Sequence, residues 1–203
     1  MKPLNWTPRY LYNRLRLAWF ERLNPDIPWL TAESVALLGK LLRAQDSVLE
    51  FGSGRSTIWF AHRCGSIVSV EHDLDWFKKV SSQIKQFSNV DYRHAKLEAP
   101  AGHVPPYLSL LDEFPNESFD VLINDGRLRH LVAEKATSKL KPGGLLVLDN
   151  AERYLPNELD IPESRRDTPP DKHWVPFEVQ TAKWRRIWTT NGITSTLIMF
   201  KPF

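Results

Sequence analysis

Short apolar stretches alternate with amphipathic ones through the middle of the chain, and this alternation limits the fold more than any other feature. Stretches with the composition of strands cover residues 47–51, 66–73, 89–95, 119–125 and 143–150. Helical spacing of apolar residues covers 56–63, 74–87 and 127–140 between them. Continuous apolar runs are typical of strands buried on both faces, as in parallel sheets. The sequence therefore predicts an α/β fold with a doubly wound, mostly parallel sheet.

The two ends of the chain depart from this alternation. Residues 8–22 and 32–43 have helical spacing, and Thr31 is a suitable N-cap for the second helix. We expect an N-terminal helical appendage over 1–44, followed by one domain over 45–203. Asn191-Gly192 separates two strand-like runs, which predicts a C-terminal antiparallel hairpin. The proline-rich segment 151–175 shows no periodicity, and its length predicts a mobile lid that shapes an acceptor pocket.

Composition narrows the choice of compartment and partner. The chain has one cysteine, so a disulfide framework within it is excluded, and no apolar stretch reaches transmembrane length. These features lead us to expect a cytoplasmic protein. A net charge of +3 is too balanced to indicate a nucleic-acid partner. The basic, aromatic helix over 8–22 either packs on the sheet or makes peripheral contact with a membrane, and the oligomeric state stays open.

A glycine turn follows the first strand, in the stretch VLEFGSGRST over residues 48–57. The strand carries one acid, Glu50, and runs directly into Gly52-Ser53-Gly54. Glycines between a strand and a helix let the backbone approach a ligand closely. The next strand ends in Glu71, about twenty residues further on, where an acid can hold ribose hydroxyls. Together these residues predict a site for a cofactor that contains a nucleoside.

The cofactor class follows from what the turn lacks. A dinucleotide fingerprint requires a third glycine, and Thr57 stands in its place. Glu50 suits a cofactor with a cationic end better than one with a diphosphate. The missing glycine speaks against an NAD(P)-dependent oxidoreductase, which nevertheless stays open as an alternative. A catalytically silent cofactor-binding or RNA-associated module is a further alternative.

With these residues the chain resembles the class I S-adenosylmethionine-dependent methyltransferases. VLEFGSGRST is similar to their first motif and VSVEHD to their second, while FDVLINDG and LKPGGLLVLDN resemble their fourth-strand and fifth-strand motifs. The resemblance implies a Rossmann-like fold, methyltransferase activity and S-adenosylmethionine as the cofactor. It implies that Glu50 faces the methionine amino group and that Glu71 binds the ribose. The remaining cofactor residues that it implies are Gly52, Ser53, Gly54, Ser56, Thr57, His72, His94, Ala95 and Asp125.

A second group of polar residues ends the fourth and fifth predicted strands. Asp125, Asp149 and Asn150 carry oxygen ligands of the kind that Mg²⁺ prefers. Their placement resembles the metal triad of catechol O-methyltransferase-like enzymes, which implies a metal that binds an acceptor hydroxyl. Those enzymes carry a lysine base where this chain has Leu128. We therefore expect Asp125 and His130 to act in catalysis, on a hydroxyl of a small molecule or glycan; without a metal, the triad only lines the pocket.

Overall fold

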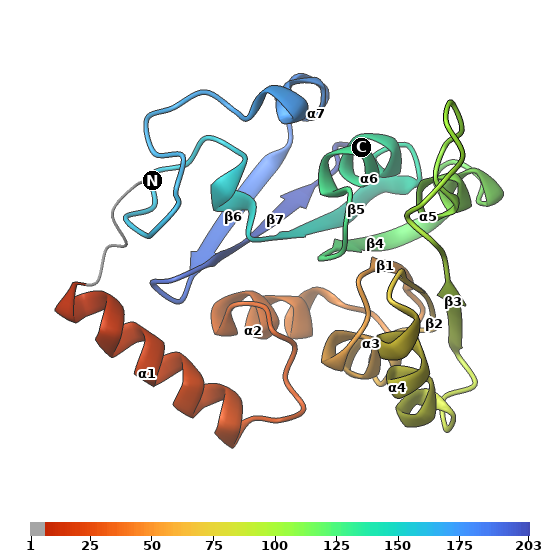
Figure 1. Ribbon diagram of the computed structural model, residues 1–203, viewed down its shortest axis with the longest axis horizontal. Coiled ribbons are helices and arrows are strands. Elements are labelled where there is room, and N and C mark those ends of the chain that lie inside the picture. The colour runs from red at the N-terminus through yellow and green to blue at the C-terminus, as the bar shows by residue number, and fades with distance from the viewer. Residues whose placement is uncertain (1–6) are drawn as a thin grey trace.

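The computed structural model describes residues 7–203 and contains one seven-stranded sheet in the order β3-β2-β1-β4-β5-β7-β6 (Figure 1). The parallel part of the sheet joins β3, β2, β1, β4 and β5, and the last two strands pair antiparallel. The predicted doubly wound α/β sheet with a C-terminal hairpin is therefore confirmed. The strands are β1 (Ser47–Phe51), β2 (Ser66–Glu71), β3 (Val90–His94), β4 (Phe119–Asn124), β5 (Leu140–Asp149), β6 (Arg185–Thr190) and β7 (Ser195–Phe200).

Helices cover both faces of this sheet. In Figure 1, α2, α3 and α4 lie on one side of the sheet, while α5, α6 and α7 lie on the other. The α-helices are α1 (Pro8–Leu23), α2 (Ala32–Leu41), α3 (Arg55–Ala61), α4 (Leu74–Ile84), α5 (Pro106–Ser109), α6 (Arg129–Ala136) and α7 (Val175–Gln180). Short 3-10 helices are η1 (Leu110–Glu113), η2 (Ala151–Arg153) and η3 (Lys172–Trp174).

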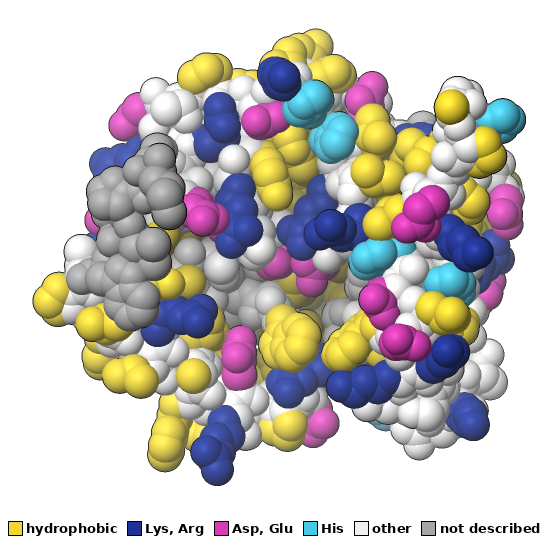
Figure 2. Space-filling model, in the orientation of Figure 1, with side chains coloured by type: hydrophobic (Ala, Val, Ile, Leu, Met, Phe, Trp, Pro, Cys, Tyr) yellow, Lys and Arg dark blue, Asp and Glu magenta, His cyan; other side chains and the backbone are white. Residues whose placement is uncertain are grey.

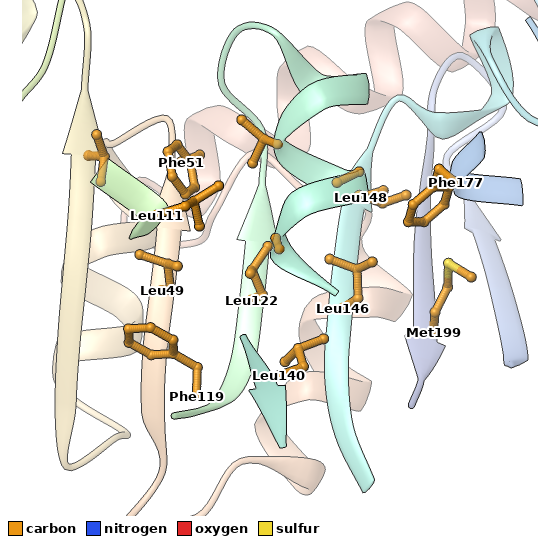
Figure 3. Packing of buried hydrophobic residues seen from close by; sticks show 14 of the residues in the cluster. Leu49, Phe51, Leu111, Phe119, Leu122, Leu140, Leu146, Leu148, Phe177 and Met199 are labelled. Atoms are coloured by element: carbon orange, nitrogen blue, oxygen red, sulfur yellow. The ribbon is translucent and has the colours of Figure 1, made fainter. Parts of the chain in front are cut away.

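Two hydrophobic clusters hold the layers together, one on each face of the sheet. Alternate residues of β1 divide between them: Leu49 and Phe51 belong to the cluster under α6 and α7, and Val48 belongs to the cluster under α2 and α3. Figure 3 shows the first cluster, where Leu122 and Leu146 of the neighbouring strands continue the same layer. Because both faces are covered, these strands are apolar at nearly every position.

The N-terminal helices form as predicted, with one difference at a cap. Thr31 precedes α2, but its hydroxyl donates to Ser34 Oγ at 2.9 Å instead of accepting a backbone N–H. Val35 and Leu38 of α2 are buried in the same cluster as Val48. The division into 1–44 and 45–203 stays a prediction, and residues 1–6 lie outside the described residues.

Segment 151–175 is anchored in the core at several points. Leu155 is fully buried and Trp174 is 3% exposed, and the Tyr154 and Trp174 rings stack with centroids 5.2 Å apart. Sequence periodicity missed the short helices η2 and η3 within it, and also α5, because such brief elements depend on packing. The mobility of this segment stays a prediction.

The turns after β1 and β4 touch each other at the point where the strand order reverses. Asp125 N–H donates to the Phe51 carbonyl at 2.9 Å, and Gly52 N–H donates to the Val70 carbonyl at 3.0 Å. Gly52 has φ +94°, and a Cβ atom there would lie 2.8 Å from the Asp125 backbone. Glycine is thus required by both conformation and space. In open α/β sheets ligands bind at this reversal, outside the carboxyl ends of the strands.

We expect Gly52→Ala to destabilise the fold more than Gly102→Ala does. Gly102 also has positive φ, +79°, but a Cβ there would meet nothing within 4 Å. The control thus carries only the conformational strain, of about 1–2 kcal/mol, while Gly52→Ala adds the clash with Asp125. Urea unfolding measures both; equal losses would show that the two turns do not press on each other.

Candidate functional site

Glu50 connects the glycine turn to the sheet through side-chain hydrogen bonds. Its Oε2 accepts from the Thr57 hydroxyl at 2.5 Å and from the Ser69 hydroxyl at 2.6 Å. Thr57 Oγ1 in turn accepts from Gly54 N–H at 3.0 Å. The carboxylate in a buried strand therefore fixes the first turn of α3, which explains why Thr57 replaces a third glycine.

The other oxygen of Glu50 has no hydrogen-bond partner. Oε1 is fully buried, and the whole residue is 0% exposed. Burial raises the pKa of Glu50 to about 7, although the Ser56, Ser69 and Thr57 hydroxyls oppose the shift. A buried acceptor without a hydrogen bond destabilises a fold by about 1–3 kcal/mol. A ligand that donates a hydrogen bond to Oε1 would remove this cost.

Glu71 joins the end of β2 to the same turn. Its Oε2 accepts from the Ser53 N–H at 3.2 Å and the Ser53 hydroxyl at 2.9 Å. Its Oε1 accepts from the backbone N–H groups of His72 and Asp73, at 2.8 and 2.9 Å. The Ser53 hydroxyl also lies 2.6 Å from Tyr92 Oη, so it can turn toward Tyr92 and leave Glu71 free for an incoming hydroxyl.

A cavity of about 670 Å³ opens above this turn, and we name it the turn cavity. Five predicted cofactor residues line it: Gly52, Ser53, Glu71, His72 and Asp125. Gly54 and Ser56 line a small adjoining cavity of about 30 Å³. The volume of the turn cavity falls within the range of about 300–1,000 Å³ that small-molecule sites occupy.

His94 and Ala95 lie beside this cavity without lining it. His94 Nε2 lies 3.1 Å from the His72 carbonyl, and its ring lies beside Phe77 with centroids 5.5 Å apart. Ala95 N–H donates to the Glu71 carbonyl at 2.8 Å. Both residues therefore extend the pairing of β2 with β3, and their predicted contact with a cofactor stays a prediction.

A second cavity, of about 600 Å³, lies between α1, the strand ends and the β6–β7 hairpin, and we name it the α1 cavity. Asp125, Asp149 and Asn150 line it, together with Trp29. Asp125 and Trp29 line the turn cavity as well. Figure 2 shows this region as a hollow near the centre of the view, with acidic side chains on its floor. Segment 151–175 contributes no lining residue to the α1 cavity, so its predicted role in shaping that pocket is not supported.

Arg129 holds the acidic strand ends together. Its Nη2 donates to Asp125 Oδ1 at 2.6 Å, its Nη1 donates to the Asp149 carbonyl, and its Nε donates to the Gly126 carbonyl at 3.0 Å. The planar guanidinium can make these bonds at once because its donors point in fixed directions. One cation therefore bridges the ends of β4 and β5.

The carboxyl groups of Asp125 and Asp149 both have raised pKa values. Burial raises the pKa of Asp125, while the Arg129 guanidinium lowers it. Burial, and then the charge of Asp125, raise the pKa of Asp149 well above its usual value. Since the groups interact, they titrate as a pair. A carboxyl pair whose pKa is raised accepts a proton more readily than an ordinary carboxylate, which suits it to general base chemistry.

The predicted Mg²⁺ ligands do not fit a metal in this arrangement. Arg129 already places a positive charge on Asp125 Oδ1. Asn150 turns its amide N–H toward Asp149 Oδ2 at 2.7 Å, so it offers a donor where a metal needs an oxygen. Residues 7–203 also hold no cluster of three His, Cys, Asp or Glu side chains suited to a metal. We therefore assign no step to Mg²⁺.

His130 does not line either cavity. It begins the first turn of α6, and its ring lies beside the His173 ring with centroids 5.3 Å apart. Burial, and then the neighbouring His173, lower its pKa. The carboxyl pair, in contrast, lines the α1 cavity directly.

Trp29 and Trp76 line the turn cavity but were not singled out from the sequence. The Arg55 guanidinium lies 5.1 Å from the centre of the Trp29 ring. Trp76 Nε1 donates to the Ser53 carbonyl at 2.8 Å and so covers the glycine turn. Neither tryptophan belongs to a motif, and no pattern in the sequence gives Arg129 a role. Three-dimensional contacts alone reveal the three.

The stability gained from Glu50→Gln is expected to grow with pH. Glu50 ionises near 4.5 when unfolded and near 7 when folded, so its contribution is present below pH 4.5 and is lost as pH rises through 7. Relative to the native protein, the variant should gain about 2–3 kcal/mol between pH 5 and pH 8. Denaturant unfolding at both pH values is the measurement; a gain independent of pH would contradict the raised pKa.

Several solved structures have a similar fold. The sequence matches no family model and no curated protein. Among solved structures, an O-methyltransferase from Bacillus cereus in complex with SAH is 18% identical with a TM-score of 0.61, over 98% of this chain and 93% of that one. A methyltransferase from Geobacter sulfurreducens is 14% identical with a TM-score of 0.56, over 94% and 89%.

A third solved structure, an rRNA methylase from Streptococcus thermophilus, is 13% identical with a TM-score of 0.57, over 84% of this chain and 95% of that one. One of these neighbours is described as an O-methyltransferase and another as an rRNA methylase, so the likeness does not point to one acceptor. At identities this low a likeness establishes the fold, and the reaction must be argued from the site. The chain has the Rossmann-like fold of the class I S-adenosylmethionine-dependent methyltransferases.

Proposed function

We propose that this chain is an S-adenosylmethionine-dependent methyltransferase that acts on a hydroxyl oxygen of a small molecule or glycan. One observation carries the proposal: the turn cavity and the α1 cavity share Asp125 and Trp29 as a common wall. A group transfer between two bound molecules needs two adjoining pockets that meet at the reacting atoms. The fold of the solved methyltransferases supports the same reaction class.

The residues that line the turn cavity suit this cofactor, and so does Glu50, which is buried behind the glycine turn and lines neither cavity. Glu71 can accept hydroxyls of a ribose once Ser53 turns toward Tyr92. The unpartnered Oε1 of Glu50 lacks a donor, and an ammonium group nearby would supply the charge that favours its ionised form. When bound, S-adenosylmethionine supplies a methyl group activated by a positively charged sulfur.

Asp125 and Asp149 are the residues proposed to handle the proton. A neutral hydroxyl is a poor nucleophile, so its proton must move to a base as the new carbon–oxygen bond forms. The pair lines the α1 cavity, and burial raises the pKa of both members. Arg129 holds the Asp125 carboxylate in place, so the negative charge of the pair is partly balanced.

An oxidoreductase is the less favoured reading of the same turn. A diphosphate would lie close to Glu50 and Glu71, which are both buried acids. Like charges at short range disfavour each other. The same acids favour a cofactor with a cationic end.

Binding of S-adenosylmethionine should release protons through Glu50. At pH 6 Glu50 is mostly protonated, since its pKa is about 7, and a nearby cation favours its ionisation. We expect release of about one proton per cofactor bound at pH 6. Calorimetry in buffers with different ionisation enthalpies measures this number.

Two variants separate the roles of the acids in that experiment. Glu50→Gln should abolish the proton release at pH 6. Glu71→Gln should weaken binding by about 1–3 kcal/mol through loss of a charged acceptor, and leave the release intact. Tighter binding of NADH than of S-adenosylmethionine would reject the proposed function.

Turnover should depend on Asp125 far more than on His130. Asp125→Asn keeps the shape of the side chain but removes the basic oxygen, so the rate should fall by about 10²–10⁴-fold. His130→Ala should change the rate little, because His130 lines neither cavity. Formation of the demethylated cofactor with a panel of hydroxyl compounds measures both. Loss of activity in EDTA, with recovery on adding Mg²⁺, would overturn the metal-free mechanism.

A further inference from the structure

Helix α1 is attached to the rest of the protein through a side that mixes polar and apolar residues. Asn13 is the one residue of α1 that is buried, and its Nδ2 donates to the Gly192 carbonyl at 3.4 Å. Arg16 Nη2 donates to the Asn191 carbonyl at 3.3 Å. The same side of the helix lines the α1 cavity through Leu17 and Phe20. A surface helix normally turns its apolar stripe inward, so this attachment is unusual.

The opposite side of α1 is a continuous apolar face, which we name the outer face. It consists of Leu11, Tyr12, Leu15, Trp19 and Leu23, which are 42, 64, 73, 67 and 63% exposed. Four of the five recur at intervals of four residues, so they lie in one row along the helix. Figure 2 shows hydrophobic side chains gathered at the lower left, over α1. Exposed apolar surface arranged in this way marks an interaction site.

The charges around the outer face are almost all positive. Helix α1 carries Arg9, Arg14, Arg16 and Arg22 against a single acid, Glu21. Glu21 lines the α1 cavity on the other side of the helix, as do Arg14 and Arg16, and Arg9 pairs with Asp160 at 3.1 Å. Arg22 is therefore the cation of α1 that has no carboxylate partner among the described residues and does not line that cavity. A partner of the outer face is expected to accept large apolar side chains and to carry negative charge.

We propose that the outer face of α1 docks on the surface of an anionic lipid bilayer, with Leu15 and Trp19 entering the headgroup region. Tryptophan and leucine beside arginines are typical of helices that lie in this interface. No helix among residues 7–203 has the length and apolar character to cross a bilayer, so the contact is peripheral. A second copy of the chain fits less well, because pairing the outer faces would bring Arg22 of each copy together, while the one acid of α1, Glu21, lines the α1 cavity.

Sedimentation with lipid vesicles tests the proposal. The protein should sediment with vesicles that contain phosphatidylglycerol and remain in solution with phosphatidylcholine alone. Leu15→Glu with Trp19→Glu should lower the partition at least about tenfold, because apolar burial is lost. Arg22→Gln should lower it about fivefold on the anionic vesicles only.

A matched control separates the outer face from exposed apolar residues in general. Val179 on α7 is 72% exposed, so Val179→Glu adds a negative charge to a different face and should not change the partition, whereas Leu15→Glu alone, with the same single charge, should lower it. Thermal unfolding confirms that the variants fold. Failure of the native protein to bind anionic vesicles would overturn the proposal. So would a dimer, seen by sedimentation velocity, that Leu15→Glu dissociates. The test needs no cofactor, so its result is independent of the proposed methyl transfer.

Discussion

The close contact between the turns after β1 and β4 determines the rest of the site. Gly52 leaves no room for a side chain against the Asp125 backbone, and Tyr107 packs over Gly126 from the other face. Because the two turns touch, Asp125 is placed at the border of both cavities. A larger residue at position 52 would separate the strand ends and with them the two pockets. The relative position of the two cavities thus depends on Gly52 having no Cβ atom.

Acidic side chains gather at the carboxyl ends of three neighbouring strands, and each is stabilised in a different way. Glu71 is surrounded by backbone N–H donors, Asp125 is bound by Arg129, and Glu50 is partly neutralised by its raised pKa. Buried charge is costly unless it is paired or protonated. Three acids kept together at this cost indicate a functional site. Among the three, only Glu50 retains a buried oxygen without a hydrogen-bond partner.

Local patterns in the sequence predicted much of this architecture. Continuous apolar runs gave the parallel strands, Asn191-Gly192 gave the hairpin, and the glycine turn with Glu71 gave a cavity where the structure has one. Thr31 takes the predicted N-cap position of α2, but its hydroxyl bonds Ser34 Oγ instead of a backbone N–H. Trp29, Arg129 and the outward orientation of α1 were not predicted. Their positions depend on packing between segments distant in sequence, which periodicity and motif spacing do not register.

The shared wall at Asp125 has a thermodynamic consequence. Each ligand that enters one cavity changes the solvation and charge around a carboxylate that also faces the other. Two ligands bound in these cavities would therefore be energetically coupled, and such coupling is reciprocal: whatever the first ligand does to the affinity of the second, the second does to the first. The strength of that coupling would depend on Asp125 and Trp29, the two side chains that both cavities share.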